Sequence, residues 1–359
     1  MFRRTYGAVV LAAIAGLVIC LTGVLPAMAG LGQPSSGELG LQDPATPGMQ
    51  GIIDLYNLVN IIIIAIAAFV LILLLYVVYR FNEKSNPTPS RTSHNTFLEV
   101  AWTIIPILIL VAMAVPSFKL LYEQYSFPKP DLTIKATGSQ WFWEHEYLDQ
   151  KITLASTMLR DEDVLKAKLG DKDFKAKYPD SLEGIARNKA THADAAAVWE
   201  ERKELRQLTV DQEIAVPVNK VVHMLVTATD VIHSWTIPSF GVKMQAVPGR
   251  TAAVWFKPTV TGVFRGQCSV LCGKFHSGMP IVIRVLPQEK YDAWMAALKA
   301  KDKKKANEIL KAETSGDASK AVAVGFCRHS EKRPSMAARP TSIKKLASRT
   351  GSLPTRLDL

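Results

Sequence analysis

The stretch QCSVLCGKFHSGMP, residues 267–280, carries two thiols, an imidazole and a thioether within 12 residues. Thiolate and thioether sulfurs select Cu(I), and imidazole suits copper as well as zinc. A further imidazole stands beside a predicted strand end, which completes the donor set His233, Cys268, Cys272, His276 and Met279. This set exceeds the two His, one Cys and weak axial Met that hold a single type 1 copper. Because a second thiolate can bridge two ions that share one electron, the stretch predicts a copper centre for fast one-electron transfer.

Two other uses of the cysteines stay open from the residues alone. Cysteines of an exported domain more often pair as a disulfide than bind a metal. A Cys-x-x-x-Cys pair with a nearby His could also hold zinc, although zinc seldom recruits Met. The softness of the donors favours copper over both, and the choice between one ion and two remains open at this point.

The sequence around this stretch has the pattern of a β domain over residues 130–298. Its short runs are rich in β-branched and aromatic residues. They are Leu132–Ala136, Trp141–Tyr147, Val221–Ala228, Ala252–Phe256, Gly262–Gly266 and Ile281–Leu286. Runs of this kind predict an antiparallel sandwich or barrel. Residues 151–207 interrupt the pattern, since they are charged, Ala-rich and helical in their later part, so we expect a mostly solvated insertion there.

Two apolar runs precede the β domain. Ile61–Tyr79 has 19 residues without a charge, and Val100–Phe118 is a second run that contains two prolines. About 20 apolar residues cross a bilayer as a helix, and prolines are tolerated in such helices. The sequence therefore predicts a transmembrane hairpin with helices over 56–80 and 99–121. A buried helical hairpin of a soluble protein is the alternative, and the length and flanks of the runs argue against it.

The flanking segments indicate the orientation of this hairpin. The connection over 81–98 carries Lys84 and Arg91, the basic bias of a cytoplasmic loop. Residues 1–29 have a basic start, an apolar stretch and a small-x-small Ala-Met-Ala end, which predict a cleaved signal peptide rather than a first anchor. We therefore expect residues 30–55, the β domain and both mature termini on the periplasmic side of a bacterial inner membrane.

The net charge of +11 is concentrated at one end of the chain. Residues 299–359 hold 15 Lys and Arg against 6 Asp and Glu, whereas residues 30–298 sum to zero. A nucleic-acid-binding protein carries its basic surface on the folded body, so we exclude that class. The basic tail over 299–359 lacks periodicity after a short Lys-rich helix and is predicted to be disordered.

Glu99 stands at the cytoplasmic start of the second predicted span. It can complement the positive end of the helix dipole or rest at the interface. An ionisable group at membrane depth is also a functional candidate, here for proton uptake. Spacing alone favours the helix-dipole interpretation.

With these motifs in order, the chain resembles subunit II of haem–copper cytochrome c oxidases, of bacterial type. The resemblance rests on GSQWFW at 138–143, DVIHSW at 230–235 and the stretch at 267–280. It implies a two-helix transmembrane hairpin followed by an all-β, cupredoxin-like Greek-key barrel that holds the binuclear Cu-A centre. The copper ligands that it implies are His233, Cys268, the backbone carbonyl of Val270, Cys272, His276 and Met279.

The resemblance also assigns roles outside the copper ligands, and one residue departs from the family. Where this chain has Val270, the family usually has a Glu that helps to bind magnesium, so a magnesium site is in doubt. Trp141 would receive the electron from cytochrome c, and Glu99 would match a carboxylate at the mouth of a proton channel. The acidic residues that would steer a basic cytochrome are Glu146, Asp211 and Asp230.

The function implied is that of the electron-input subunit of an aerobic terminal oxidase. Electrons would pass from cytochrome c through Cu-A to haem in subunit I, where oxygen is reduced to water with proton translocation. The expected partners are subunits I and III, cytochrome c and membrane lipid. A quinol oxidase subunit would lack the copper ligands, and a nitrous oxide reductase would need a large His-rich domain. A membrane-anchored copper-binding or delivery protein without an oxidase role stays the alternative.

Overall fold

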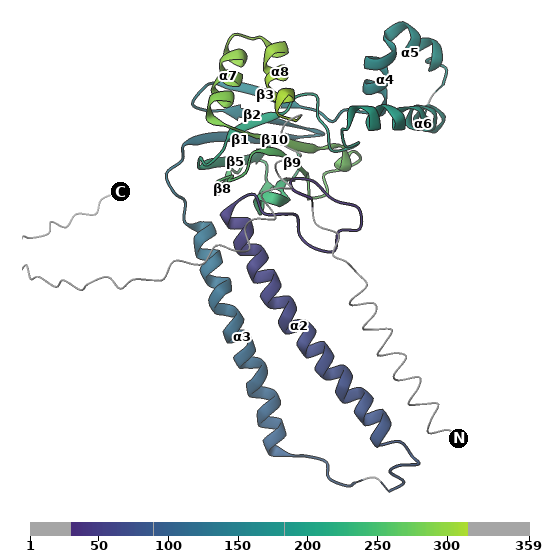
Figure 1. Ribbon diagram of the computed structural model, residues 1–359, viewed down its shortest axis with the longest axis vertical. Coiled ribbons are helices and arrows are strands. Elements are labelled where there is room, and N and C mark those ends of the chain that lie inside the picture. The colour runs from purple at the N-terminus through teal and green to yellow at the C-terminus, as the bar shows by residue number, and fades with distance from the viewer. Residues whose placement is uncertain (1–29, 89, 183, 315–359) are drawn as a thin grey trace, which may run out of the picture. The chain divides into compact units, whose positions relative to one another are not determined.

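The computed structural model describes residues 30–88, 90–182 and 184–314. The predicted signal peptide and the tail beyond residue 314 lie outside the described residues. In the described part, the chain runs through two long helices and then through a domain of short strands with additional helices (Figure 1).

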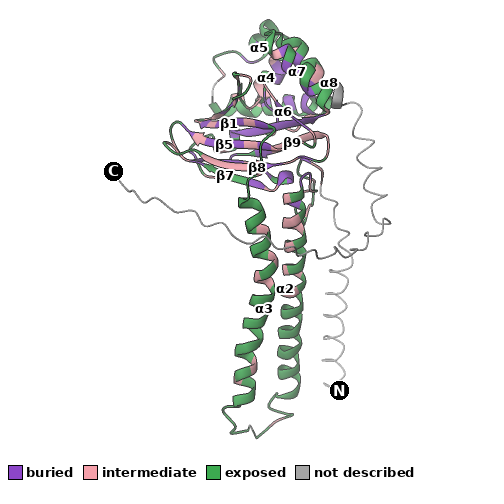
Figure 2. Cartoon of the chain, turned by 90° about the vertical axis from the view of Figure 1, so that its left-hand side faces the viewer, coloured by how far each residue is buried: buried purple, intermediate pink, exposed green. Residues whose placement is uncertain are grey.

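The two long helices are α2 (Pro47–Arg80) and α3 (Thr96–Tyr125), which lie side by side (Figure 1). The side chain of Thr46 caps α2 by accepting a hydrogen bond from the Met49 N–H at 3.0 Å. Both helices expose apolar side chains along most of their length (Figure 2), and both are long and apolar enough to cross a membrane. α2 begins nine residues before the predicted start at 56, and α3 extends beyond both ends of the predicted 99–121.

The strands of the described residues form three sheets. The first has the order β3-β2-β1-β5-β8, the second β4-β10-β9, and the third pairs β6 with β7. The strands are β1 (Leu132–Ser139), β2 (Phe142–Tyr147), β3 (Ile152–Ser156), β4 (Ile214–Pro217), β5 (Val222–Ala228), β6 (His233–Ile237), β7 (Val242–Ala246), β8 (Ala252–Phe256), β9 (Gly262–Gln267) and β10 (Pro280–Leu286). The expectation of an antiparallel arrangement is wrong for two pairs, because β1 runs parallel to β5 and β10 runs parallel to β4. Parallel neighbours need a crossover between them, and here long connections bring strands distant in sequence together.

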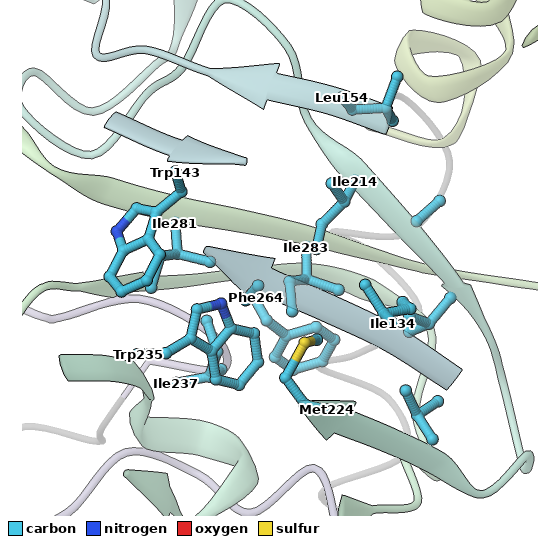
Figure 3. Close-up of a cluster of buried hydrophobic side chains, with 14 of the residues drawn as sticks. Ile134, Trp143, Leu154, Ile214, Met224, Trp235, Ile237, Phe264, Ile281 and Ile283 are labelled. Atoms are coloured by element: carbon cyan, nitrogen blue, oxygen red, sulfur yellow. The ribbon is translucent and has the colours of Figure 1, made fainter. Parts of the chain in front are cut away.

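The core lies between the sheets and is built from large apolar side chains. Along β1 and β5 every second residue is buried, as expected of strands with one covered face. Figure 3 shows the inward side chains, among them Trp143 of β2, Trp235 of β6 and Phe264 of β9, which are fully buried. All residues of β10 are buried, so this strand lies at the centre of the domain.

The segment between residue 31 and α2 belongs to the β domain by its hydrogen bonds. The Arg265 N–H donates to the Gly32 carbonyl at 2.7 Å, and the Ala45 N–H donates to the Ser239 carbonyl at 2.9 Å. Gly32 has φ of +73°, and a Cβ there would lie 2.3 Å from the Val263 carbonyl oxygen, so only glycine fits. These contacts fix the start of α2 against the strands.

The insertion is smaller and better packed than the sequence predicts. It cannot begin at 151, because β3 pairs with β2 in the first sheet. Three helices follow: α4 (Asp161–Leu169), α5 (Asp171–Lys177) and α6 (Gly184–Arg202). Most of their residues are exposed, as predicted, but the helices also enclose a separate apolar cluster of Val164, Leu165, Phe174, Tyr178, Ala195, Val198 and Trp199.

Within the described residues, two helices follow β10. They are α7 (Gln288–Lys299) and α8 (Lys303–Thr314), and they contact each other. The prediction of disorder from residue 299 is wrong for α8, because Ala306 and Leu310 are buried in the main core. Ala306, Ile309 and Leu310 recur at helical spacing and form the face by which α8 packs against the domain.

Candidate metal centre

The candidate centre lies in the connection between β9 and β10, with one residue supplied by β6. β9 and β10 are antiparallel, and residues 268–279 join them. The Cys268 N–H donates to the Met279 carbonyl at 3.0 Å, which closes this connection into a loop. His233 is the first residue of β6 and is fully buried. The loop and the start of β6 thus bring residues 35 or more positions apart to one place.

The two cysteines face each other as free thiols. Their sulfur atoms lie 3.8 Å apart, whereas a disulfide requires about 2.05 Å. Two metal–sulfur bonds of about 2.3 Å can span this distance through a shared ion. The geometry therefore fits two thiolates that share a metal ion and not the disulfide alternative.

The remaining predicted donors divide between the two sulfurs. On one side, Cys268 Sγ lies 4.0 Å from His233 Nδ1 and 3.3 Å from the Val270 carbonyl oxygen. On the other side, Cys272 Sγ lies 3.5 Å from His276 Nδ1 and 3.6 Å from Met279 Sδ. Each thiol thus has one imidazole nitrogen and one weaker donor as neighbours. The structure brings together all six residues that the sequence singled out for copper.

The centre is largely shielded from water. Cys268, Cys272 and Met279 are each at most 5% exposed, and only His276 among the imidazoles is half-buried. Burial, followed by the charge of neighbouring Cys268, raises the pKa of Cys272 to about 12. A cation in the pocket would reverse this preference, because a coordinating thiol loses its proton. His233, Cys268 and Cys272 have ligand atoms within 4.8 Å of one another, which is close enough to share a metal.

Asp230 orients the buried imidazole. Its Oδ1 accepts from His233 Nε2 at 2.9 Å, which leaves Nδ1 facing Cys268. Burial alone would raise the pKa of Asp230, but hydrogen bonds from His233 and from the Val231 and Gln140 N–H groups lower it overall. A carboxylate on the second nitrogen is the usual way to fix a metal-binding imidazole. Asp230 therefore positions the His233 ring of the centre, in addition to being an acidic residue at the protein surface.

The aromatic motif packs over the cysteine loop. The Trp141 indole N–H and the Gln140 side-chain amide both donate to the Cys272 carbonyl, at 3.2 and 2.9 Å. Trp141 is half-buried and contacts Phe275 edge to face, with 5.1 Å between the ring centroids. Trp143, by contrast, is fully buried and lies 6.0 Å from the His233 ring. Trp141 is thus the tryptophan that reaches from solvent to a cysteine of the centre.

The other predicted site residues lie apart from the thiols. Glu146 is in β2 between Lys135 and Thr153, and Asp211 accepts from the Thr157 N–H at 2.7 Å. The Val270 side chain carries no oxygen, so at this position the chain offers no carboxylate to magnesium.

Glu99 lies in the first turn of α3. Its carboxylate accepts a hydrogen bond from the Asn95 N–H at 3.3 Å. The Asn95 side chain in turn accepts a hydrogen bond from the Leu98 N–H. This reciprocal pair of hydrogen bonds gives Glu99 a role in capping the start of α3.

Three hydroxyl residues that join the loop to β6 were not anticipated from the sequence. Ser269 Oγ lies 3.0 Å from Ser234 Oγ and 2.7 Å from Thr236 Oγ1, which attaches the loop to β6. Small hydroxyl residues are common on all surfaces, so their type gave no signal. Gln140 was also missed as a contact of Cys272, although it stands beside Trp141.

Known proteins match both parts of the chain. The family model "Cytochrome C oxidase subunit II, transmembrane domain" matches residues 34–120, and the model of the periplasmic domain matches residues 189–286. Cytochrome c oxidase subunit 2 of Cereibacter sphaeroides is 42% identical over 267 residues, which cover 74% of this chain and 82% of that protein. The protein of the same name from Zea mays is 38% identical over 266 residues, covering 72% and 88%.

Among solved structures, the periplasmic domain of subunit II of cytochrome oxidase (CoxB) of Bradyrhizobium japonicum is similar to part of the chain. It is 40% identical, with 49% of this chain and 99% of that chain covered and a TM-score of 0.36.

The matches confirm the predicted family and the predicted order of a two-helix transmembrane hairpin before a β-rich, cupredoxin-like periplasmic domain. They favour the electron-input role over the copper-delivery alternative. The chain belongs to the cytochrome c oxidase subunit II family and is the membrane-anchored electron-input subunit of a haem–copper terminal oxidase, an oxidoreductase complex.

Proposed function

We propose that the centre binds two copper ions as a binuclear Cu-A site. The ligands would be the six residues that surround the two sulfurs: His233, Cys268, the Val270 carbonyl, Cys272, His276 and Met279. The division of donors into two halves, each with one imidazole and one weaker donor, supports this assignment most directly, because a single ion would leave one half unused. A lone zinc site would not need the thioether or the second half.

When bound, the copper pair would supply one-electron chemistry, taking an electron from reduced cytochrome c and giving it to haem in subunit I. This chain's residues keep the donors in place and exclude water. Asp230 holds the His233 ring, Gln140 holds the Cys272 carbonyl, and the Ser269 cluster holds the loop. With the donors held by these hydrogen bonds, little movement would be needed between oxidation states, which suits rapid transfer.

Trp141 is the proposed electron-accepting residue at the surface. Its ring is half-buried and its N–H is bonded to the carbonyl of a ligand cysteine. Glu146, Asp211 and Asp230 would attract a basic cytochrome c, since complementary charge mainly raises the association rate. Subunits I and III are the proposed partners within the oxidase complex.

The arrangement in the membrane is part of the same proposal. Residues 81–98 would face the cytoplasm, and both mature termini would lie in the periplasm after removal of residues 1–29. Glu99 would then lie at the cytoplasmic end of α3, where a carboxylate could take up protons besides capping the helix. We propose no magnesium ligand at Val270.

Copper analysis combined with electron paramagnetic resonance tests the binuclear assignment. We expect two coppers on this chain, in addition to the copper that subunit I of a haem–copper oxidase holds, and a seven-line mixed-valence signal that Cys268→Ser abolishes. Leu271→Ala serves as the matched control, because Leu271 lies in the same loop, is 78% exposed and supplies no donor. A four-line spectrum from a single copper would contradict the assignment.

Stopped-flow reduction tests the role of Trp141. Trp141→Phe removes the indole and its N–H, so reduction by cytochrome c should slow at least tenfold. The copper signal and reduction by a small neutral reductant should stay unchanged, which separates electron input from folding. An unaltered rate with cytochrome c would assign the input to another residue.

A further inference from the structure

A cavity of about 720 Å³ lies where the two long helices meet the β domain. Its walls come from the start of α2, the last residues of α3, and the strands β7 and β8. The Trp255 indole N–H donates to the Gln124 carbonyl at 3.0 Å, which attaches β8 to the end of α3. This cavity lies apart from the copper loop, none of whose residues contributes to its lining.

The position of the cavity relative to the apolar run of α3 shows at which depth of the membrane the cavity lies. The run of α3 ends at Phe118, and Lys119 is the first lining residue after it. Tyr122 and Tyr125, which also line the cavity, are 71% and 73% exposed. Tyrosines and lysines at the end of a membrane helix mark the headgroup level of the bilayer. The cavity therefore opens where lipid headgroups lie.

The lining combines an apolar surface with positive charge. Most of the lining residues are apolar or aromatic, including Met244, Val254 and Phe256. The charged residues are three lysines (Lys119, Lys243 and Lys257) and one acid, Glu123. Lys119 lies 4.0 Å from Glu123 within the same helix, so Lys243 and Lys257 supply the net positive charge. An apolar pocket with net positive charge at headgroup level fits an amphiphile with an anionic head.

We propose that this cavity binds a phospholipid with an anionic headgroup. The phosphate would lie near Lys243 and Lys257, the glycerol end of the acyl chains would contact Met244 and Val254, and the chains would run along the exposed apolar residues of α3 into the bilayer. Basic residues near a membrane surface attract anionic lipids by electrostatics. The lipid would fill the space between α3 and β8 and hold the copper domain at a fixed height on the hairpin. The proposal is independent of the number of coppers bound.

Photo-labelling of the purified oxidase complex tests the proposal. The probe is phosphatidylglycerol with a diazirine in one acyl chain, and mass spectrometry locates the adducts. We expect adducts in residues 119–127 and 253–257 and about tenfold fewer with the matching phosphatidylcholine probe. Lys243→Gln combined with Lys257→Gln should reduce phosphatidylglycerol labelling to the phosphatidylcholine level.

Two further variants keep the result interpretable. Lys151→Gln combined with Lys189→Gln makes the same change in charge away from the cavity and should label like the parent complex. Ala253→Trp fills the cavity and should remove labelling by both probes while oxidase activity and the copper signal persist. Absence of adducts in the parent complex, or equal labelling in both lysine pairs, would overturn the proposal. A photo-cross-linking residue placed at 253 that attached to another oxidase subunit would overturn it as well.

Discussion

The copper loop is held in place mainly by hydrogen bonds, whereas the inserted helices are held together by apolar packing. Residues 268–279 have almost no regular structure, and their positions depend on hydrogen bonds from Gln140, Ser234 and the loop's own ends. The helices α4, α5 and α6 are regular, and they are held by an apolar cluster of their own. The loop is rich in chemically distinctive residues, whereas the insertion has ordinary ones. The metal-binding residues of the irregular loop can therefore be recognised in the sequence. The buried cluster of the regular helices can be overlooked, because its residue types are common.

A side chain at the start of the insertion reaches the copper loop. The Arg160 guanidinium at the start of α4 lies 5.9 Å from the centre of the Phe275 ring in the loop. The apolar clusters of the insertion and of the β domain are separate. We therefore expect the insertion to unfold without loss of the copper centre.

The largest expected effect comes from Trp199→Ala in α6. Trp199 is 5% exposed and its indole N–H donates to Asp161 at 2.8 Å. Loss of a buried tryptophan costs about 3–5 kcal/mol, and a cluster this small cannot compensate for it. Limited proteolysis should then cut within residues 161–202, while the copper signal stays intact.

Trp199→Phe is the matched control for that variant. It keeps most of the buried area and removes the hydrogen bond, so it should cost about 1–2 kcal/mol and leave the insertion protected. Loss of copper in Trp199→Ala would show that the insertion and the copper loop fold together. The two regions would then not be ordered independently.

A smaller effect is expected from Asp161→Asn, which probes the polar side of the same cluster. Asp161 accepts from Trp199, from Arg206 in a two-pronged contact, and from His192. Burial raises the pKa of Asp161, but the hydrogen bonds from Arg206 and Trp199 outweigh it and hold the pKa below the ordinary value of 3.8. The ionised carboxylate thus stabilises the insertion above about pH 4, and this contribution is lost as the pH falls through the lowered pKa.

Amide hydrogen exchange in α4 and α6 measures this dependence. Asp161→Asn should cost about 1–2 kcal/mol at neutral pH, and the difference from the parent chain should shrink below about pH 4. Asp180→Asn is the control, because the Asp180 side chain is 95% exposed. A difference independent of pH would show that shape, not charge, makes Asp161 important.

The same contrast explains what the sequence could predict. The copper donors were identifiable because Cys, His and Met in one short stretch are rare, and the structure places them together. Glu99 and Val270 were placed by sequence position alone, and their roles remain predictions. The cluster of the insertion was missed because Phe174 and Trp199 stand among lysines and acids, and only the packing of three helices buries them. The parallel pairs of β1 with β5 and β10 with β4 depend on long connections, which local patterns do not encode.

The smallest effect is expected at Val270, where the loop departs from its family. The residue offers its backbone carbonyl, 3.3 Å from Cys268 Sγ, and a half-buried side chain that contributes no donor atom. Val270→Glu keeps the carbonyl, so the electron paramagnetic resonance signal should stay nearly unchanged. The new carboxylate would add only an oxygen donor of the kind that magnesium prefers. A large change in the signal would mean that the side chain at this position influences the copper directly, and that the loop's shape depends on more than its backbone contacts.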